Sequence, residues 1–241
     1  MEIYRLGRTD PEAIDLSLRR ERERRFLSSE RKKLDDLLFI YEPTESFSIN
    51  RDRDMESVRK ATENEFRHYI AEKDIPIIKT KRGGGMIWHG PGQVCLDPLI
   101  NLERIKMNGP DYPCVLERAC IEVLRHFNIV AVTNRYIAGA QGAWLEGKDQ
   151  VKRKIAFLGW SCVRSMAIHG CAINVCPDLY PFSLIDPCNL KGVEVTSMDR
   201  NLLKHPTIEE VGKIASEIFI DLLYKQNKLK SPESSRDFYL G

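Results

Sequence analysis

The sequence predicts one α/β domain of the α+β type, in which helices flank a mixed β-sheet. Two observations carry this prediction. Short apolar runs bounded by turn residues recur along the chain, as strands do, and separate stretches place apolar residues at helical spacing. A length of 241 residues fits one large domain, and neither a repeat of fixed period nor a linker divides it.

The helices are predicted from their start signals and apolar stripes. Asp10 precedes a proline, which is typical of the first helical position, and Thr207 with Glu210 forms a capping-box pattern. Helices are therefore expected over residues 11–33, 54–72 (weakly), 114–127 and 207–225. Beyond residue 225 the chain becomes polar, so we expect a catalytic domain over 1–225 and a loose tail over 226–241.

Strands are predicted where apolar runs lie between turn residues. The expected strands cover residues 37–41, 75–78, 86–89, 94–100, 129–132, 142–145, 155–163 and 167–175. Between two of them, the charged stretch 148–154 reads as a polar hairpin.

The composition excludes several classes of function. A net charge of +2 is too small for a surface adapted to nucleic acid, and no apolar run approaches the ~20 residues of a membrane span. Seven cysteines without paired CxxC spacing indicate reduced thiols. The stretch 19–33 carries eight basic and three acidic residues. It could receive an acidic partner, or it could be a solvated helix face with internal ion pairs.

A glycine-rich stretch points to a ligand site. Residues 82–85 read Arg-Gly-Gly-Gly, and residues 90–92 read Gly-Pro-Gly, on either side of an apolar run. Glycines at this density let a backbone approach a ligand closely, whereas a flexible linker lacks flanking strands. We therefore interpret this stretch as a ligand-contacting loop.

Cys188 follows Pro187 and precedes Gly192, which predicts a constrained turn. On these local features alone, a buried inert thiol is favoured over a nucleophile. A nucleophilic thiol needs a nearby base or cation, for which Lys154 and His169 are candidates.

Several residues that could bind a metal ion fall close together in the sequence. Cys162, His169, Cys171 and Cys176 lie within fifteen residues, but without paired spacing. On the predicted strand, His169 and Cys171 share a face while Cys176 does not. The sequence predicts no metal and no cofactor.

Four segments together resemble the lipoyl(octanoyl) transferases, in that family's order and spacing. Residues 82–93 (RGGGMIWHGPGQ) are similar to the signature RGGxxTYHGPGQ, and 154–159 (KIAFLG) to KIAxxG. Residues 169–175 (HGCAINV), followed by Asp178-Leu179, are similar to HGLALNVxxDL, and 182–197 to FxxIxPCGxxGxxVTS. Weaker similarity extends from about residue 3 to residue 224.

The resemblance implies the catalytic fold of biotin and lipoate protein ligases and an acyltransferase activity. An octanoyl, or lipoyl, group would pass from acyl carrier protein to a lysine of lipoyl domains, as the first step of protein lipoylation. Cys188 would be the acyl-thioester nucleophile and Lys154 its acid/base partner. The implied substrate-binding residues are Arg82, Gly83, Gly84, Gly85, Met86, Ile87, Trp88, His89, Phe157, Leu158, Gly159, Gly170, Cys171 and Ala172.

The resemblance also implies partners and a location. The donor would be octanoyl-acyl carrier protein, and the acceptors the lipoyl domains of 2-oxoacid dehydrogenases and the glycine cleavage H protein. We expect a monomer that binds neither nucleic acid nor membrane, in the mitochondrion if the source is eukaryotic and in the cytoplasm otherwise.

Five positions depart from the family pattern. Ile87-Trp88 replaces Thr-Tyr, Arg153 replaces a small residue, Cys171 replaces leucine, and Asn189 stands where glycine is typical. No acid, base or nucleophile is lost, but Trp88 and Cys171 could change the length of the acyl pocket. Asn189 is expected to tolerate a positive φ.

Two alternatives remain open at this point. One is an ATP-dependent lipoate ligase or amidotransferase of related fold, which would work through an adenylate and would not need the Pro-Cys turn. The other is a non-catalytic module that binds acyl carrier protein or lipoyl domains and forms no covalent acyl-enzyme.

Overall fold

A mixed β-sheet is the central element of the computed structural model, which describes residues 1–30, 32–134 and 139–225. Within those residues the sheet has nine strands, and its main path runs β1-β2-β6-β11-β8-β12. Its strands are β1 (Glu2–Thr9), β2 (Leu37–Pro43), β6 (Gln93–Asn101), β7 (Gly142–Glu146), β8 (Lys152–Leu158), β9 (Ser161–Val163), β10 (Met166–Ile168), β11 (Cys171–Asn174) and β12 (Glu194–Val195). β1 pairs parallel to β2 and β12 parallel to β8, while the other pairs are antiparallel. The mixed sheet expected from the sequence is confirmed.

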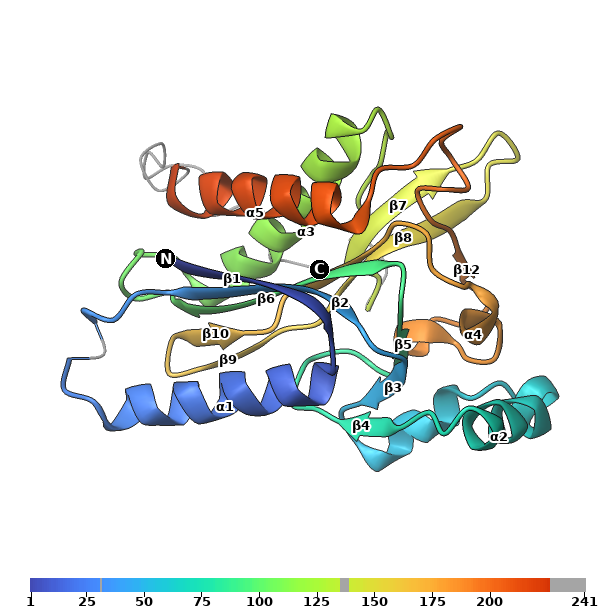
Figure 1. Cartoon of the computed structure of the whole chain (residues 1–241), viewed down its shortest axis with the longest axis horizontal. Helices are drawn as coiled ribbons and strands as arrows, with labels where there is room; N and C mark the ends of the chain where they lie inside the picture. The colour runs from blue at the N-terminus through green and yellow to red at the C-terminus, as the bar shows by residue number, and fades with distance from the viewer. Residues whose placement is uncertain (31, 135–138, 226–241) are drawn as a thin grey trace, which may run out of the picture.

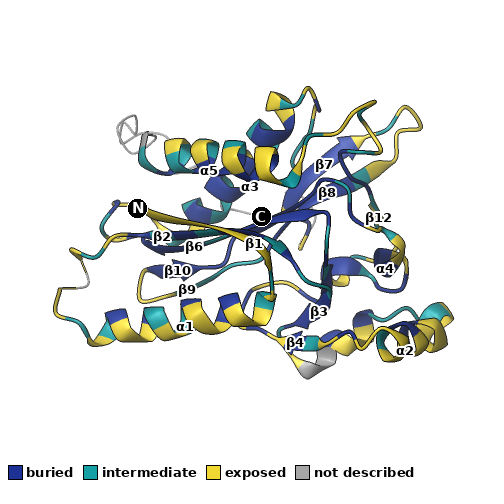
Figure 2. Ribbon diagram, viewed as in Figure 1, coloured by how far each residue is buried: buried dark blue, intermediate teal, exposed yellow. Residues whose placement is uncertain are grey.

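Helices cover both faces of this sheet. α3 (Tyr112–His126) and α5 (Ile208–Lys225) lie on one face, and α1 (Pro11–Leu27) lies on the other (Figure 1). Alternation along β6 explains why both faces are covered: Val94 and Leu96 pack toward the α3 and α5 side, whereas Cys95 and Leu99 pack toward α1. Dark buried strands between helices with exposed outer faces show the same layering (Figure 2).

A second, three-stranded sheet supports the glycine-rich loop. It consists of β4 (Ile77–Lys79), β3 (Ser46–Ile49) and β5 (Ile87–His89) in that order, within the described residues. The short helices η1 (Asp52–Ser57) and η2 (Lys60–Thr62) lead from it into α2 (Glu63–Glu72). The weak helix expected over 54–72 is therefore helical only in pieces.

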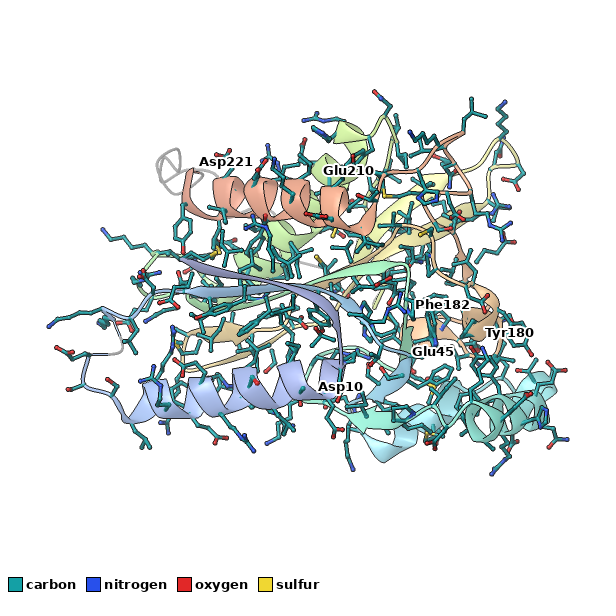
Figure 3. The ribbon with its side chains drawn as sticks, viewed as in Figure 1. Asp10, Glu45, Tyr180, Phe182, Glu210 and Asp221 are labelled. Carbon is teal, nitrogen blue, oxygen red and sulfur yellow. The ribbon has the colours of Figure 1, made fainter. Side chains whose placement is uncertain are left out.

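The start signals predicted for α1 and α5 are present. The Asp10 side chain accepts a hydrogen bond from the backbone N–H of Glu12 at 2.9 Å. Thr207 and Glu210 exchange the reciprocal bonds of a capping box, at 2.7 and 3.2 Å. Asp10 and Glu210 lie at the starts of their helices in Figure 3.

α1 ends earlier than the sequence analysis expected. It stops at Leu27 and not at Lys33, because Ser28 takes an extended conformation and its hydroxyl accepts a hydrogen bond from the N–H of Glu30. Serine competes for backbone groups in this way and favours helix ends. In the described part of the chain, no helix is long and apolar enough to span a membrane.

The basic stretch 19–33 is mostly paired or buried, so the interpretation as an ion-paired helix face is favoured. Arg22 and Arg25 are buried, with Arg25 bonded to Glu21 at 2.8 Å. Among the described residues of this stretch, which exclude residue 31, the other ion pairs are Arg19–Asp15, Arg24–Glu21, Lys32–Glu103 and Lys33–Glu30.

Several strand predictions need correction. β1 was not predicted. The expected strand 155–163 breaks after Leu158, and the expected strand 167–175 breaks at His169, whose φ of 64° interrupts the pleat. His169 therefore does not share a strand face with Cys171. Residues 129–132 form only one bridge, between Val132 and Trp144, and the polar turn at 148–154 is shorter than expected because β8 begins at Lys152.

The core beneath α3 generates a stability prediction. Leu116 is fully buried against the main sheet, so Leu116→Ala should lower the free energy of unfolding by about 2–5 kcal/mol. Leu27 on α1 is 90% exposed, and Leu27→Ala should change the free energy of unfolding by less than about 0.5 kcal/mol. Urea denaturation of the two variants measures both values, and equal losses would contradict the assignment of this core.

Candidate active site

Cys188 lies on a strained turn that faces the small sheet. The turn is the short helix η4 (Pro187–Asn189), in which Cys188 has φ 57° and ψ 28°, and Asn189 has φ 62°. A left-handed conformation is uncommon for cysteine, and such strain is concentrated at functional sites. The backbone N–H of Cys188 donates to the carbonyl of Met86 at 2.9 Å, which attaches the turn to the glycine-rich loop.

Asn189 closes the gap between the turn and that loop. Its side-chain oxygen accepts a hydrogen bond from the Ser57 hydroxyl. A Cβ placed on Gly85 would lie 2.2 Å from the same oxygen, so a side chain at position 85 has no room. The positive φ expected for Asn189 is present, and its amide joins η1 to the turn.

The thiol of Cys188 is enclosed by apolar side chains. The residue is 7% exposed and packs in a cluster that includes Met86, Trp88, Phe157 and Phe182. Phe182 stacks on Phe157 with ring centres 5.3 Å apart and meets Trp88 edge-on at 5.4 Å. Phe182 comes from the short helix α4 (Tyr180–Ser183), seen beside the small sheet in Figure 3.

Lys154 brings an amine to the same enclosed space. It is fully buried on β8, and its Nζ lies 5.2 Å from the centre of the Trp144 ring and 5.1 Å from that of Phe157. Nζ has no hydrogen-bond partner among the residues that the structure describes. Burial lowers the pKa of Lys154, while the nearby charges of Cys188 and Glu117 act to raise it. Desolvation favours the neutral amine, which is the form that can accept a proton.

The Arg82 side chain binds the glycine-rich loop through several hydrogen bonds. Its guanidinium donates to the Ser48 hydroxyl at 2.6 Å, to the Ser48 carbonyl at 3.0 Å and to the Gly83 and Gly85 carbonyls at 3.0 and 3.1 Å. Burial lowers the Arg82 pKa, and the nearby Cys188 acts to raise it. Because its donors are shared between Ser48 on β3 and the loop carbonyls, Arg82 fixes the loop to the small sheet.

A buried hydrogen-bond chain connects the four signature segments, and sequence reasoning assigned it no role. Gln93 Nε2 donates to Asn174 Oδ1 at 2.9 Å, and Asn174 Nδ2 donates to the Thr196 carbonyl at 2.9 Å. The Thr196 N–H then donates to the carbonyl of Lys154 at 2.9 Å. The only sequence signal was the place of these polar residues inside apolar signature segments, where a buried amide needs a partner.

A cavity beside this constellation contains most of the predicted pocket residues. Nine of the fourteen line it: Arg82, Ile87, His89, Phe157, Leu158, Gly159, Gly170, Cys171 and Ala172. The other five, Gly83, Gly84, Gly85, Met86 and Trp88, do not line it; Gly85, Met86 and Trp88 contact the Cys188 turn or its cluster instead. Phe157 and Ile87 belong both to the cavity wall and to the Cys188 cluster.

The cavity wall away from this cluster is polar, which the sequence did not indicate. Tyr41 donates to Asp97 at 2.7 Å, and desolvation raises the pKa of Asp97. His169 Nε2 lies 3.1 Å from Asp15 Oδ1, so this ring is tied to an acid from α1. These four residues line the cavity together with the acyl-pocket residues.

His89 is a neutral wall residue. Its Nδ1 lies 3.3 Å from Gln93 Oε1, and desolvation with the nearby Arg82 charge lowers its pKa to about 3. Within the described residues, no group of three or more His, Cys, Asp or Glu side chains is arranged to hold a metal ion.

The buried Lys154 gives a stability prediction with a defined pH sign. Because its folded-state pKa is lowered, the unfolded chain binds one more proton between that pKa and the ordinary value of 10.5. Lys154→Met should therefore raise the free energy of unfolding at pH 7 by about 1–2 kcal/mol, a gain that shrinks as pH rises toward 10.5. Lys152→Met, at an exposed position on β8, is the matched control. Urea titrations across pH test this, and a Lys154→Met variant less stable than the parent at pH 7 would contradict it.

Comparison with known proteins identifies a matching family model and related sequences. Residues 20–220 match the family model for the lipoyl protein ligase A/B catalytic domain. A curated octanoyltransferase of Xanthomonas euvesicatoria is 40% identical over 131 residues, which cover 54% of this chain and 53% of that protein. The chain thus spans about half the length of that relative. An octanoyltransferase of Shewanella halifaxensis is 29% identical over 97% of both chains.

Solved structures show the same fold at low sequence identity. The lipoate protein ligase of Thermoplasma acidophilum, studied with its E2 lipoyl domain, aligns with a TM-score of 0.67 at 14% identity over 92% of this chain and 83% of its own. A biotin protein ligase of Aquifex aeolicus with biotin and ATP aligns at 0.54 and 13% identity, over 94% of this chain and 72% of its own. The fold expected from the sequence resemblance is confirmed. The chain belongs to the family of lipoyl protein ligase A/B catalytic domains.

Proposed function

We propose that this protein transfers an octanoyl group from the thioester of an acyl carrier protein to a lysine of a lipoyl domain, through a thioester on Cys188. The observation that carries the proposal is the shared enclosure of Cys188 and Lys154, in which a desolvated amine has no hydrogen-bond partner among the described residues. The relatives named octanoyltransferase support the acyl group and the reaction class.

The first half-reaction follows from this pair. The Cys188 thiol gives its proton to the neutral Lys154 amine, and the thiolate attacks the carbonyl carbon of the donor thioester. A new C–S bond forms to Cys188 while the bond to the donor sulfur breaks. The departing thiolate takes the proton back from the Lys154 ammonium, so the donor leaves as a free thiol.

The second half-reaction converts the thioester into an amide. The amine of the acceptor lysine attacks the acyl carbon, the C–N bond forms, and the Cys188 thiolate leaves. Lys154 relays a proton to that thiolate, which restores the starting state. A thioester is less stable than an amide, so the sequence needs no ATP, unlike the ligase alternative.

The acyl chain would lie along the wall that the cavity shares with the Cys188 cluster, where Phe157 and Ile87 supply an apolar surface beside the small Ala172. The cavity holds about 50 Å³, less than an eight-carbon chain occupies, so its lining side chains must shift to admit the chain. Burial at about 0.8 kcal/mol per methylene can favour an eight-carbon chain over much shorter acids. The 2-oxoacid dehydrogenases and the glycine cleavage H protein are the proposed acceptors. A monomeric state and a mitochondrial location stay predictions, and the relatives named above are bacterial.

The covalent intermediate is directly testable. Incubation with octanoyl-acyl carrier protein, without ATP or acceptor, should give a mass adduct of one octanoyl group that peptide mapping places on Cys188 and hydroxylamine removes. Cys188→Ala should acquire none, whereas the control Cys176→Ala should acquire it normally. An adduct on the Cys188→Ala protein would contradict the mechanism, and transfer that requires ATP would favour the ligase alternative.

The proton relay predicts a large kinetic effect at Lys154. Lys154→Met should slow acylation of Cys188 at pH 7 by about 10²–10⁴-fold, because the thiol loses its proton acceptor. Quenched-flow mass spectrometry measures this rate, with Lys152→Met as the control that should retain it. Since the same Lys154→Met protein is expected to be more stable than the parent, unfolding cannot explain the loss. A rate within threefold of the parent would remove Lys154 from the mechanism.

A further inference from the structure

A second cavity is bordered by η1 and by the segment around the cysteine turn. It measures about 330 Å³, a size typical of small-ligand pockets. Its lining residues come from η1 and from the turn: Asp54, Glu56, Ser57, Asp186, Asn189 and Lys191. It shares no lining residue with the acyl pocket. Backbone hydrogen bonds hold its two walls together, including Asp186 N–H to the Ser57 carbonyl at 2.7 Å.

The lining is acidic, with three carboxylates against the single Lys191. Asp186 is already engaged, since it accepts from Arg59 at 3.0 Å and from the Gly192 N–H at 3.3 Å. Glu56 is exposed to solvent. The cavity therefore keeps carboxylate charge available to a cation.

Asp54 is the observation that points to a ligand. It is 1% exposed, and its Oδ2 accepts from the backbone N–H groups of Asn50 and Arg51, both at 2.9 Å. Its Oδ1 is buried and has no hydrogen-bond partner among the described residues. A buried carboxylate oxygen without a donor is costly, and a cationic donor entering the cavity would satisfy it.

The cavity borders the cysteine turn. Asn189 lines it and directly follows Cys188, and the same Asn189 side chain contacts Ser57 and packs on Gly85. Cys188 itself does not line the cavity, so Asn189 is the residue that joins the cavity to the cysteine turn.

We infer that this acidic cavity receives the ε-ammonium group of the acceptor lysine before it attacks the acyl-enzyme, with Asp54 and Glu56 as the binding carboxylates. This inference rests on the proposed function and specifies how its second substrate is recognised. A lysine side chain offers three charged donors, which suit a carboxylate-lined cavity. The donor's phosphopantetheine arm carries a phosphate, which the same carboxylates would repel.

The chemistry balances with the lysine arriving as a cation. The ammonium releases one proton to become the nucleophilic amine, the C–N bond forms, the C–S bond breaks, and the second nitrogen proton is carried to the Cys188 sulfur. The products are the amide, the free thiol and one proton in solution. The cavity concentrates the lysine but takes no part in bond making.

The test measures the two half-reactions separately, in variants in which these carboxylates are replaced by amides. Asp54→Asn keeps an oxygen for the Asn50 and Arg51 N–H groups but removes the charge, and Glu56→Gln changes only an exposed side chain. In the double variant, the apparent KM for a lipoyl domain should rise about tenfold or more. Acylation of Cys188 by octanoyl-acyl carrier protein precedes lysine entry and should keep its rate. Glu65→Gln, an exposed carboxylate on α2, is the matched control.

A neutral nucleophile distinguishes recognition from damage to the site. Hydroxylamine, which is uncharged at neutral pH, should cleave the acyl-enzyme of the parent and the double variant at equal rates. An unchanged KM, or an equal loss with lysine and with hydroxylamine, would overturn the cavity assignment. Failure of the parent protein to form any acyl-enzyme would instead overturn the proposed function, and the cavity assignment with it.

Discussion

The burial of a lysine amine beside a cysteine thiol is the constraint on which the site depends. Lys154 is held between the Trp144 and Phe157 rings, where its ammonium form is disfavoured. A backbone that moved β8 by one residue would turn this side chain to the opposite face of the sheet. The position of the amine is therefore fixed by strand register, and residues far from the chemistry contribute to it.

That register is secured by polar atoms in an apolar core. The chain from Gln93 through Asn174 to Thr196 ends on the backbone of Lys154, so three strands and the segment after the cysteine turn are joined by directional bonds. Buried amides are stable only when their partners are present, so alternative pairings of these strands leave them unsatisfied. The hydrogen bonds select one arrangement, while the surrounding apolar contacts provide most of the stability.

The sequence indicated the fold where local signals act alone. The capping box at Thr207 and the apolar stripe over 114–127 specify helices through neighbouring residues, and both helices are present. The local sequence did not predict β1. Its side chains are almost all exposed, so the sequence has no apolar alternation, and the strand is defined by its pairing with β2. His169 similarly takes a left-handed conformation that was not predicted from the local sequence.

The site residues could be predicted where they fall inside the signature segments. Cys188 and Lys154 were singled out by resemblance, and the structure brings them into one enclosure. The polar wall formed by Tyr41, Asp97, Asp15 and His169 was not predictable, because it joins α1 to two separate strands and to the turn at His169. Contacts between residues far apart in sequence leave no local pattern, and side-chain pairing of this kind appears only once the strands are placed.

The two cavities give a physical account of how one thiol could serve two substrates in turn. An acyl chain requires apolar burial, whereas a lysine requires carboxylates and water, and one pocket cannot satisfy both without a large desolvation cost. Here the apolar wall at Phe157 and the carboxylates at Asp54 and Glu56 belong to two cavities that share no lining residue. Cys188 and Asn189 both take left-handed conformations in the turn, yet their surroundings differ, since Cys188 packs in the apolar cluster while Asn189 lines the acidic cavity. Strain of this kind is concentrated at functional sites, and here it accompanies a turn whose adjacent residues lie in chemically opposite environments.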